Sequence, residues 1–350
     1  MIDVTQDLLS QEMRMYDWAE FRVLKYLLAI VELKGFRAAA EHLRTAQPNL
    51  STQAKQFQEA SGMHLFRTAK GNRLRLTETG VAFKPIVRGL LKAQVEAMDA
   101  LLAIEQGQIS ALKLGCATMA DHGVFHKFCK MHKELLPNRP IHAEHGDTVQ
   151  LIEEIVSGEI DGAIVIMPVN DLRLCIEEIR SDRLVVCLPA DHPLAEKAFL
   201  DPTDLHTNLK ILYHPRRHPD AHRRLLELLT EAGVTPEGYS RVSHPSEMQS
   251  LVKQGYGFSL IREGSALDPE LTTRPVAGVN WTVDIAFVYK KEGHPKTIPV
   301  LVRNLKRELA EFEAKKTPKK PVPSPQDANR IAKRPPRSVG KKAEQMTLLG

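Results

Sequence analysis

The sequence predicts an α/β protein that begins with an all-α unit and continues through one long helix into a module of two lobes. Three observations predict this organisation. Apolar residues recur at helical spacing over residues 18–60, and a second helical pattern runs over residues 78–107. From residue 110, short apolar segments of strand length alternate with amphipathic helices. Such alternation is typical of largely parallel sheets with ligand sites beyond the strand ends.

Three helices are expected in the N-terminal unit, at residues 18–33, 36–43 and 47–60. Gly35 ends the first helix, and the alanines of the second let it lie close to the third. Pro48 is accepted in the first turn of the third helix, because the N–H that proline lacks has no intrahelical partner there. Residues 1–15 are expected to be an N-terminal extension outside this unit.

The third helix has an outer face that is polar but almost uncharged, over a buried stripe of Leu50, Ala54 and Phe57. Amide side chains can pair with adenine edges in the major groove of DNA, and hydroxyls and lysine suit phosphate oxygens or guanine. The residues expected to contact DNA, including two from the segment that follows, are Gln47, Pro48, Asn49, Ser51, Thr52, Gln53, Lys55, Arg73 and Arg75. The alternative is a solvated helix rich in amides.

The segment after the third helix is basic and has the pattern of a hairpin. Residues 65–68 and 73–76 flank a Gly-Asn pair that favours a tight turn. Between residues 34 and 76, eight basic side chains stand against two acidic ones, a local charge of +6. Such an excess is typical of phosphate binding. Residues 16–77 are therefore expected to form a winged helix-turn-helix.

A long helix is expected after Thr77, which is a suitable helix cap. Eight apolar residues alternate by threes and fours from Phe83 to Leu102. A stripe of this kind belongs to a coiled coil or to a helix packed on its twin. The alternative is that the helix packs on its own domain.

These features together resemble the LysR-type transcriptional regulators, over the chain to about Phe312. The matching segments are Gly35-Phe36, residues 47–51, Leu65-Phe66 and residues 76–80.

Two positions depart from the family pattern. Ala46 stands where the family usually has serine, and Thr52 where it usually has arginine. An alanine at a helix N-cap costs about 1 kcal/mol relative to serine, so Thr45 is the expected substitute cap.

The resemblance implies a ligand-responsive, sequence-specific DNA-binding regulator without catalysis or cofactor. Its expected partners are operator DNA, a small-molecule effector, further copies of itself in a dimer or tetramer, and RNA polymerase. It also implies a dimerising linker helix and an effector module over residues 110–314 that is similar to periplasmic solute-binding proteins. Lobe one is expected at residues 110–167 plus 292–314 and lobe two at residues 168–291, with crossings at Met167-Pro168 and residues 290–295.

Four residues are expected to contact the effector. Thr118, Thr148 and Ser246 stand at or just before predicted helix starts, where free N–H groups favour anions; Thr118 also matches a family position that touches effector. Simple capping is the alternative for Thr148 and Ser246. Arg262 replaces a common proline of the family and could hold a carboxylate by two parallel bonds, or be solvated. A small organic anion is therefore the expected effector.

The basic run at residues 214–218 is expected to be a solvated helix start.

Cysteine and histidine spacing assigns no metal site. The four cysteines lack CxxC spacing and are expected to be buried thiols. A redox role would need Cys175 and Cys187 to pair. His122 and His126 could share a helix face near Cys129 and His132, but no HExxH pattern accompanies them.

The rest of the composition excludes several classes. No segment approaches the roughly 18 apolar residues of a membrane span, and residues 1–10 lack the pattern of a signal peptide, so the expected location is the cytoplasm. Residues 315–350 carry a charge of +8 and are expected to be a disordered basic tail rich in Pro and Lys. The alternative function, an enzyme or solute-binding protein that uses the two-lobed module, lacks a Ser/His/Asp grouping, a phosphate loop or a metal signature.

Overall fold

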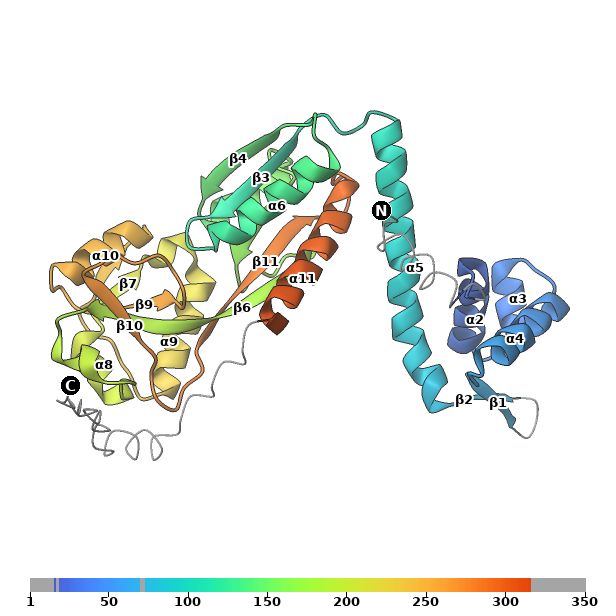
Figure 1. Cartoon of the computed structure of the whole chain (residues 1–350), viewed down its shortest axis with the longest axis horizontal. Coiled ribbons are helices and arrows are strands. Elements are labelled where there is room, and N and C mark those ends of the chain that lie inside the picture. The colour runs from blue at the N-terminus through green and yellow to red at the C-terminus, as the bar shows by residue number, and fades with distance from the viewer. Residues whose placement is uncertain (1–15, 17–18, 70–72, 316–350) are drawn as a thin grey trace, which may run out of the picture. The chain divides into compact units, whose positions relative to one another are not determined.

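The structure is a computed structural model that describes residues 16, 19–69 and 73–315. The chain divides into two compact units, residues 1–106 and 107–350 (Figure 1). The expected N-terminal extension, the start of the first helix, the turn of the hairpin and the basic tail lie outside the described residues. Within the described part, no helix is long and apolar enough to cross a membrane.

The first unit is the winged helix-turn-helix that the sequence predicts. Its elements are α2 (Phe21–Leu33), α3 (Phe36–Leu43), α4 (Gln47–Ser61), β1 (Phe66–Ala69) and β2 (Arg73–Leu76), the two strands being antiparallel. Leu27, Ile30 and Leu50 are fully buried in the core that these elements share. The hydrophobic stripes therefore face inward, as their spacing requires.

The ends of the first helices differ in detail from the prediction. Lys34 rather than Gly35 takes the left-handed conformation at the end of α2, with φ of 51°. Thr45 does not cap α4: the helix begins after Ala46 without a side-chain cap, and the Thr45 hydroxyl lies 3.5 Å from the Asn49 amide nitrogen. The backbone completes the first turn of α4, because the Asn49 N–H donates to the Ala46 carbonyl at 3.1 Å and Pro48 has no N–H to satisfy.

The long helix is α5 (Glu78–Glu105), and Thr77 caps it by accepting a 3.0 Å hydrogen bond from the Gly80 N–H. Phe83 and Val87 pack into the core of the first unit. Seven large apolar side chains of this helix are exposed, namely Val81, Ile86, Leu90, Val95, Met98, Leu101 and Leu102. Most of its apolar stripe is thus uncovered in the single chain.

The second unit contains a seven-stranded sheet with the main order β10-β6-β11-β5-β3-β4, β9 also pairing with β6. Its first part holds the parallel strands β3 (Leu112–Ala117), β4 (Ile141–Gly146) and β5 (Gly162–Ile166), and the antiparallel β11 (Thr282–Lys290). The helices here are α6 (His122–Leu135), α7 (Thr148–Ser157) and α11 (Thr297–Lys315), of which α6 and α11 lie side by side (Figure 1). Phe128 of α6 stacks on Phe287 of β11 with ring centroids 4.6 Å apart.

The other part of the second unit is built on the end of β6 (Leu174–Pro189). This strand pairs there with β9 (Ser259–Arg262) and β10 (Leu271–Arg274). The remaining elements are the parallel pair β7 (Ile211–Tyr213) and β8 (Ser240–Val242), the helices α8 (Pro202–Asn208), α9 (Pro219–Glu231) and α10 (Pro245–Lys253), and the short 3-10 helices η1 (Pro193–Glu196) and η2 (Pro215–Arg217).

Strand β6 runs through both lobes, which moves the expected boundaries. Residues 174–183 pair with β11, and residues 184–189 pair with β9 and β10. Residues 174–183 and 282–290 therefore belong to the sheet of lobe one, although the sequence placed them in lobe two. The chain crosses within β6 and again before β11, not at Met167-Pro168 and not after Lys290. From here on, lobe one means residues 110–183 and 282–315, and lobe two means residues 184–281.

Candidate functional site

The outer face of α4 is open to solvent as the DNA prediction requires. Leu50, Ala54 and Phe57 are buried. The exposed residues on the other side are Gln47, Pro48, Asn49, Ser51, Thr52 and Lys55. Gln53 is half-buried, and its amide donates to Gln56 at 3.3 Å. The helix therefore presents amides and hydroxyls, the groups that can pair with base edges.

The hairpin places two arginines directly opposite each other. Arg67 of β1 faces Arg75 of β2 in the antiparallel register, and both are exposed. Like charges at directly opposed positions destabilise a strand pair unless an anion lies between or beside them. Arg67 was not among the residues expected to contact DNA, although it contributed to the local charge. The side chain of Arg73 lies outside the described residues.

Thr118 and Thr148 lie where the parallel strands of lobe one end. The Thr118 hydroxyl donates to the Gly146 carbonyl at 3.0 Å, and the Thr148 hydroxyl accepts from the Ile166 N–H at 3.4 Å. Thr148 is buried, with 5% exposure. Gly146 ends β4 and Ile166 ends β5, so both threonines meet the carboxyl edge of the sheet, where α/β proteins bind ligands.

Lobe two reaches this edge through the basic run that was expected to be solvated. Arg217 lies 3.2 Å from Asp147, which caps α7. His218 accepts the Ala221 N–H at Nδ1 and donates from Nε2 to the Ile166 carbonyl at 2.7 Å. Burial lowers the pKa of His218, in keeping with a neutral ring that donates from one nitrogen and accepts at the other. The prediction of a solvated helix start was therefore wrong for His218, which is half-buried, whereas Arg217 is exposed and pairs with Asp147.

Arg262 is already paired with carboxylates of the protein. Its Nη1 lies 3.3 Å from Asp121 and its Nε lies 3.9 Å from Asp182. Arg180 of β6 donates to both aspartates, at 2.8 Å to Asp182. The prediction that the Arg262 guanidinium is solvated or free to hold an effector carboxylate therefore needs correction, since two arginines and two aspartates balance one another here.

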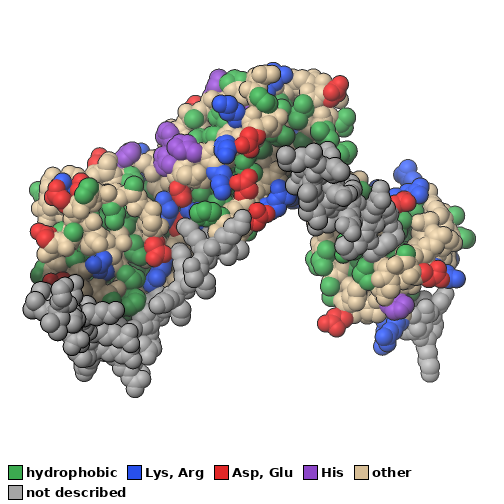
Figure 2. All heavy atoms as spheres, viewed as in Figure 1, with side chains coloured by type: hydrophobic (Ala, Val, Ile, Leu, Met, Phe, Trp, Pro, Cys, Tyr) green, Lys and Arg blue, Asp and Glu red, His purple; other side chains and the backbone are tan. Residues whose placement is uncertain are grey.

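Histidine side chains gather on one part of the α/β domain (Figure 2). The group that the sequence considered does not assemble around Cys129, because His132 is fully buried elsewhere, with its Nε2 3.2 Å from the Arg139 carbonyl. The ligand atoms that do come together are those of Cys116, His122 and His145, all within 4.8 Å of one another. Neither Cys116 nor His145 was considered a ligand from the sequence.

The cysteines lie far from a redox arrangement. Cys175 and Cys187 are twelve residues apart on the single strand β6, which is about 35–40 Å in extended chain. A disulfide needs Cα atoms within about 7 Å, so the considered pairing is wrong. Burial raises the pKa of Cys116 and of Cys187 to about 12, and that of Cys129 to about 11. These thiols therefore keep their protons in the metal-free protein and are poor nucleophiles.

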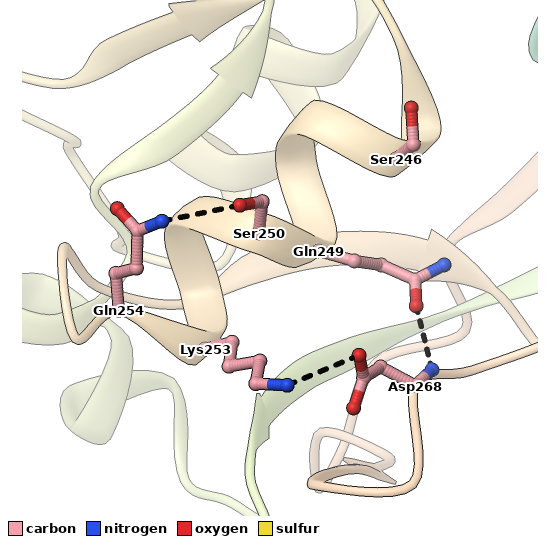
Figure 3. A pocket seen from close by; sticks show the side chains of 6 residues that line it. All are labelled: Ser246, Gln249, Ser250, Lys253, Gln254 and Asp268. Carbon is pink, nitrogen blue, oxygen red and sulfur yellow. Dashed lines mark hydrogen bonds and ion pairs between the residues drawn. The ribbon is translucent and has the colours of Figure 1, made fainter.

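Ser246 lies in a different environment, an open hollow of about 580 Å³ on α10 (Figure 3). The other polar side chains of the hollow bond to one another: Gln249 accepts from the Asp268 N–H at 2.8 Å, and Lys253 lies 3.4 Å from the Asp268 carboxylate. In the close view the Ser246 hydroxyl points away from them. None of the residues that line this hollow is among the other expected effector contacts.

An exposed amide-rich helix in a winged helix-turn-helix, joined to a two-lobed α/β module, defines a DNA-binding regulator with an effector-binding domain. Two family models match the chain: the bacterial regulatory helix-turn-helix protein, lysR family, over residues 21–81, and the LysR substrate binding domain over residues 105–310. The chain belongs to the LysR family of transcriptional regulators. LysR-family regulators are not enzymes, so the alternative prediction of an enzyme that uses the two-lobed module is wrong.

Named relatives share this organisation at low identity. The chain is 24% identical to the regulator AlsR of Bacillus subtilis, over 79% of this chain and 91% of AlsR. It is 26% identical to the regulator BenM of Acinetobacter baylyi, over 69% of this chain and 80% of BenM.

Solved structures agree with the fold. Full-length BenM superposes with a TM-score of 0.52 at 23% identity, covering 86% of this chain and 100% of BenM. Full-length CbnR in complex with its target DNA gives 0.50 at 20% identity, covering 82% of this chain and 99% of CbnR.

Proposed function

We propose that this LysR-family regulator binds specific operators through α4 and the wing, and that a small organic anion binding at the carboxyl edge of the lobe-one sheet changes that binding. The observation that carries the effector part is that Thr118 and Thr148 of lobe one and Arg217 and His218 of lobe two all bond to residues at or next to the ends of β4 and β5. The regulator would act in the cytoplasm, where its operators are.

For DNA, the proposed base contacts are those of the α4 outer face, Gln47, Asn49, Ser51, Thr52, Gln53 and Lys55, with Pro48 shaping its start. Arg73 and Arg75, joined by Arg67, would contact phosphates. Phosphate contacts position a protein on DNA and base contacts give sequence preference. The opposed pair Arg67 and Arg75 supports the wing assignment, because DNA phosphates relieve the repulsion between these two exposed guanidinium groups.

For the effector, Arg217 is the cation that an anion can reach. Its side chain is 49% exposed and pairs with Asp147, which in turn accepts the Gln150 N–H at the start of α7. An effector carboxylate could take the place of Asp147 on Arg217 and accept a hydrogen bond from the Thr118 hydroxyl, which would then no longer donate to the Gly146 carbonyl. Such an exchange replaces the direct contact between Arg217 and Asp147 by a contact between the lobes through the ligand, which links binding to the arrangement of the lobes.

Two of the expected contacts take different parts in this proposal. Ser246 remains a proposed contact because its hydroxyl at the start of α10 is exposed. Arg262 acts through Asp121 rather than by direct binding.

Self-association is proposed from α5, because a second copy would cover its exposed apolar side chains. RNA polymerase stays a proposed partner on the family resemblance alone.

The experiment is a thermal-shift screen of the full-length protein with small carboxylates and their neutral amides. At least one carboxylate is expected to raise the melting temperature while its amide does not. Arg217→Leu should remove the shift, Thr118→Val should reduce it, and Arg216→Leu, a change of the neighbouring exposed arginine, should keep it. An equal rise of the melting temperature with a carboxylate and with its amide, or a rise that persists in Arg217→Leu, would contradict the anion site. Neither result would bear on the proposed DNA binding.

A further inference from the structure

A thiol and two imidazoles meet at the edge of lobe one, beside the effector contacts just described. Cys116 of β3 and His145 of β4 are directly paired in the parallel register, and His122 is the first residue of α6. Their three ligand atoms lie within 4.8 Å of one another.

Ring packing supports this cluster. The His122 and His145 rings stack with centroids 5.1 Å apart and planes 21° from parallel. The ring centroids of Phe125 and His145 lie 6.1 Å apart.

We propose that Cys116, His122 and His145 bind a divalent transition-metal ion of the zinc class. One thiolate and two imidazoles suit Zn²⁺ or Co²⁺, whereas Mg²⁺ and Ca²⁺ require oxygen ligands. Two ligand atoms on one tetrahedral Zn²⁺ lie about 3.3–3.8 Å apart. Binding would bring the three ligand atoms closer together and turn at least one of the two stacked rings, so that both imidazole nitrogens point at the ion. On binding, the S–H bond of Cys116 breaks, the sulfur bonds the metal, and the proton leaves to solvent.

The site has one closed and one open side. The Cys116 side chain is fully buried, His122 is half-buried and His145 is exposed. An ion would enter past His145 and keep its fourth position open to water, as in zinc sites with three protein ligands. The metal would also hold the first turn of α6, whose cap Asp121 contacts Arg262 of lobe two. Occupancy can thus act on the contact between the lobes independently of the proposed anion.

The test is a Co²⁺ titration of the metal-free, reduced full-length protein. We expect the charge-transfer absorption of a thiolate–Co²⁺ bond together with intense tetrahedral bands, and the loss of both on adding Zn²⁺. His145→Ala should weaken Co²⁺ binding by at least about tenfold, since even partners outside the first coordination shell are worth about 10–100-fold. Cys116→Ser should abolish the charge-transfer absorption.

Two neighbouring substitutions are the matched controls. His126→Ala changes the exposed histidine one turn along α6, and Cys129→Ser changes a thiol outside the cluster; both should bind Co²⁺ as the wild type does. His145 is exposed, so His145→Ala should fold, and circular dichroism verifies this. A wild-type protein without the thiolate absorption, or a folded His145→Ala variant with unchanged affinity, would overturn the proposal even if Cys116→Ser does not fold.

Discussion

Arg262 of lobe two lies 3.3 Å from Asp121 of lobe one, the residue that caps α6. Arg180 and Asp182 complete this charge cluster, and the four side chains are only 11–19% exposed. Burial by itself would raise the pKa of Asp121, but the hydrogen bond from Arg180 and the charge of Arg262 hold it below 3.8. The cluster is therefore a charge-balanced contact between the lobes, placed where β6 passes from one to the other.

Removing Arg262 should destabilise the α/β domain. In Arg262→Leu, Asp121 and Asp182 share Arg180 as their remaining arginine, so the free energy of unfolding should fall by about 1–3 kcal/mol. Urea denaturation measures this. The control is Arg173→Leu, which removes the exposed arginine that pairs with Asp171 and should change stability little. Equal effects of the two substitutions would show that the cluster contributes nothing beyond a surface ion pair.

Gly80 is required by a close approach of backbone. A Cβ added there would lie 1.9 Å from the Leu65 carbonyl oxygen, so Gly80→Ala must displace the start of α5 from the segment before the wing. We expect a loss of about 1–3 kcal/mol in the stability of the first unit. Gly89→Ala on the same helix meets open space and should stabilise it by up to about 1 kcal/mol. Thermal unfolding compares the two variants. A Gly80→Ala variant with an unchanged melting temperature would contradict the close contact between Gly80 and the Leu65 carbonyl.

The wing should contribute to affinity but not to sequence preference. Arg75→Ala is expected to weaken binding to operator and to random DNA alike, and to reduce the slope of log K against log salt by about one unit. Arg22→Ala, a change of an exposed arginine on α2, should leave the slope unchanged. Fluorescence anisotropy over a salt series measures both variants. A loss confined to operator DNA would instead assign Arg75 to base contact.

Acid should destabilise the α/β domain through buried histidine. His132 is fully buried, and this burial lowers its pKa below 6.5, so the unfolded chain binds its proton more readily than the folded chain. Stability is then complete above about pH 6.5 and falls as the pH drops toward the folded-state pKa. His132→Gln should flatten the decline between about pH 7 and 5.5, whereas His142→Gln, at an exposed site, should not. Urea midpoints across this range decide the question.

The N-terminal unit could be predicted almost completely because its information is local. Helical periodicity, the Pro48 position and the alternation around the hairpin each act within a few residues. The α4 cap was wrong because a threonine next to the cap position does not reveal whether its hydroxyl turns toward the helix. In this fold it lies near the Asn49 amide instead.

The second unit could be predicted only in part, because its important relations join distant segments. Five of the six residues 177–182 are polar, so the first half of β6 was not predicted as a strand and the lobe boundary was misplaced. Arg262 meets Asp121, and Cys116 meets His145, only after the strands have taken their register. Spacing along the chain contains no signal for either pair. The alternation of strands and helices predicted the α/β architecture. It did not predict which side chains come together in the folded domain.

The central claim, that α4 contacts bases in specific operators, is tested most directly by selecting genomic DNA fragments with the full-length protein and sequencing those bound. The wild type is expected to enrich a few sites that share a short dyad-symmetric sequence. Gln47→Ala should lose about 1–3 kcal/mol at those sites and much less on random DNA. Uniform coverage of the genome by the wild type, or an equal loss on both kinds of DNA in the variant, would contradict the claim.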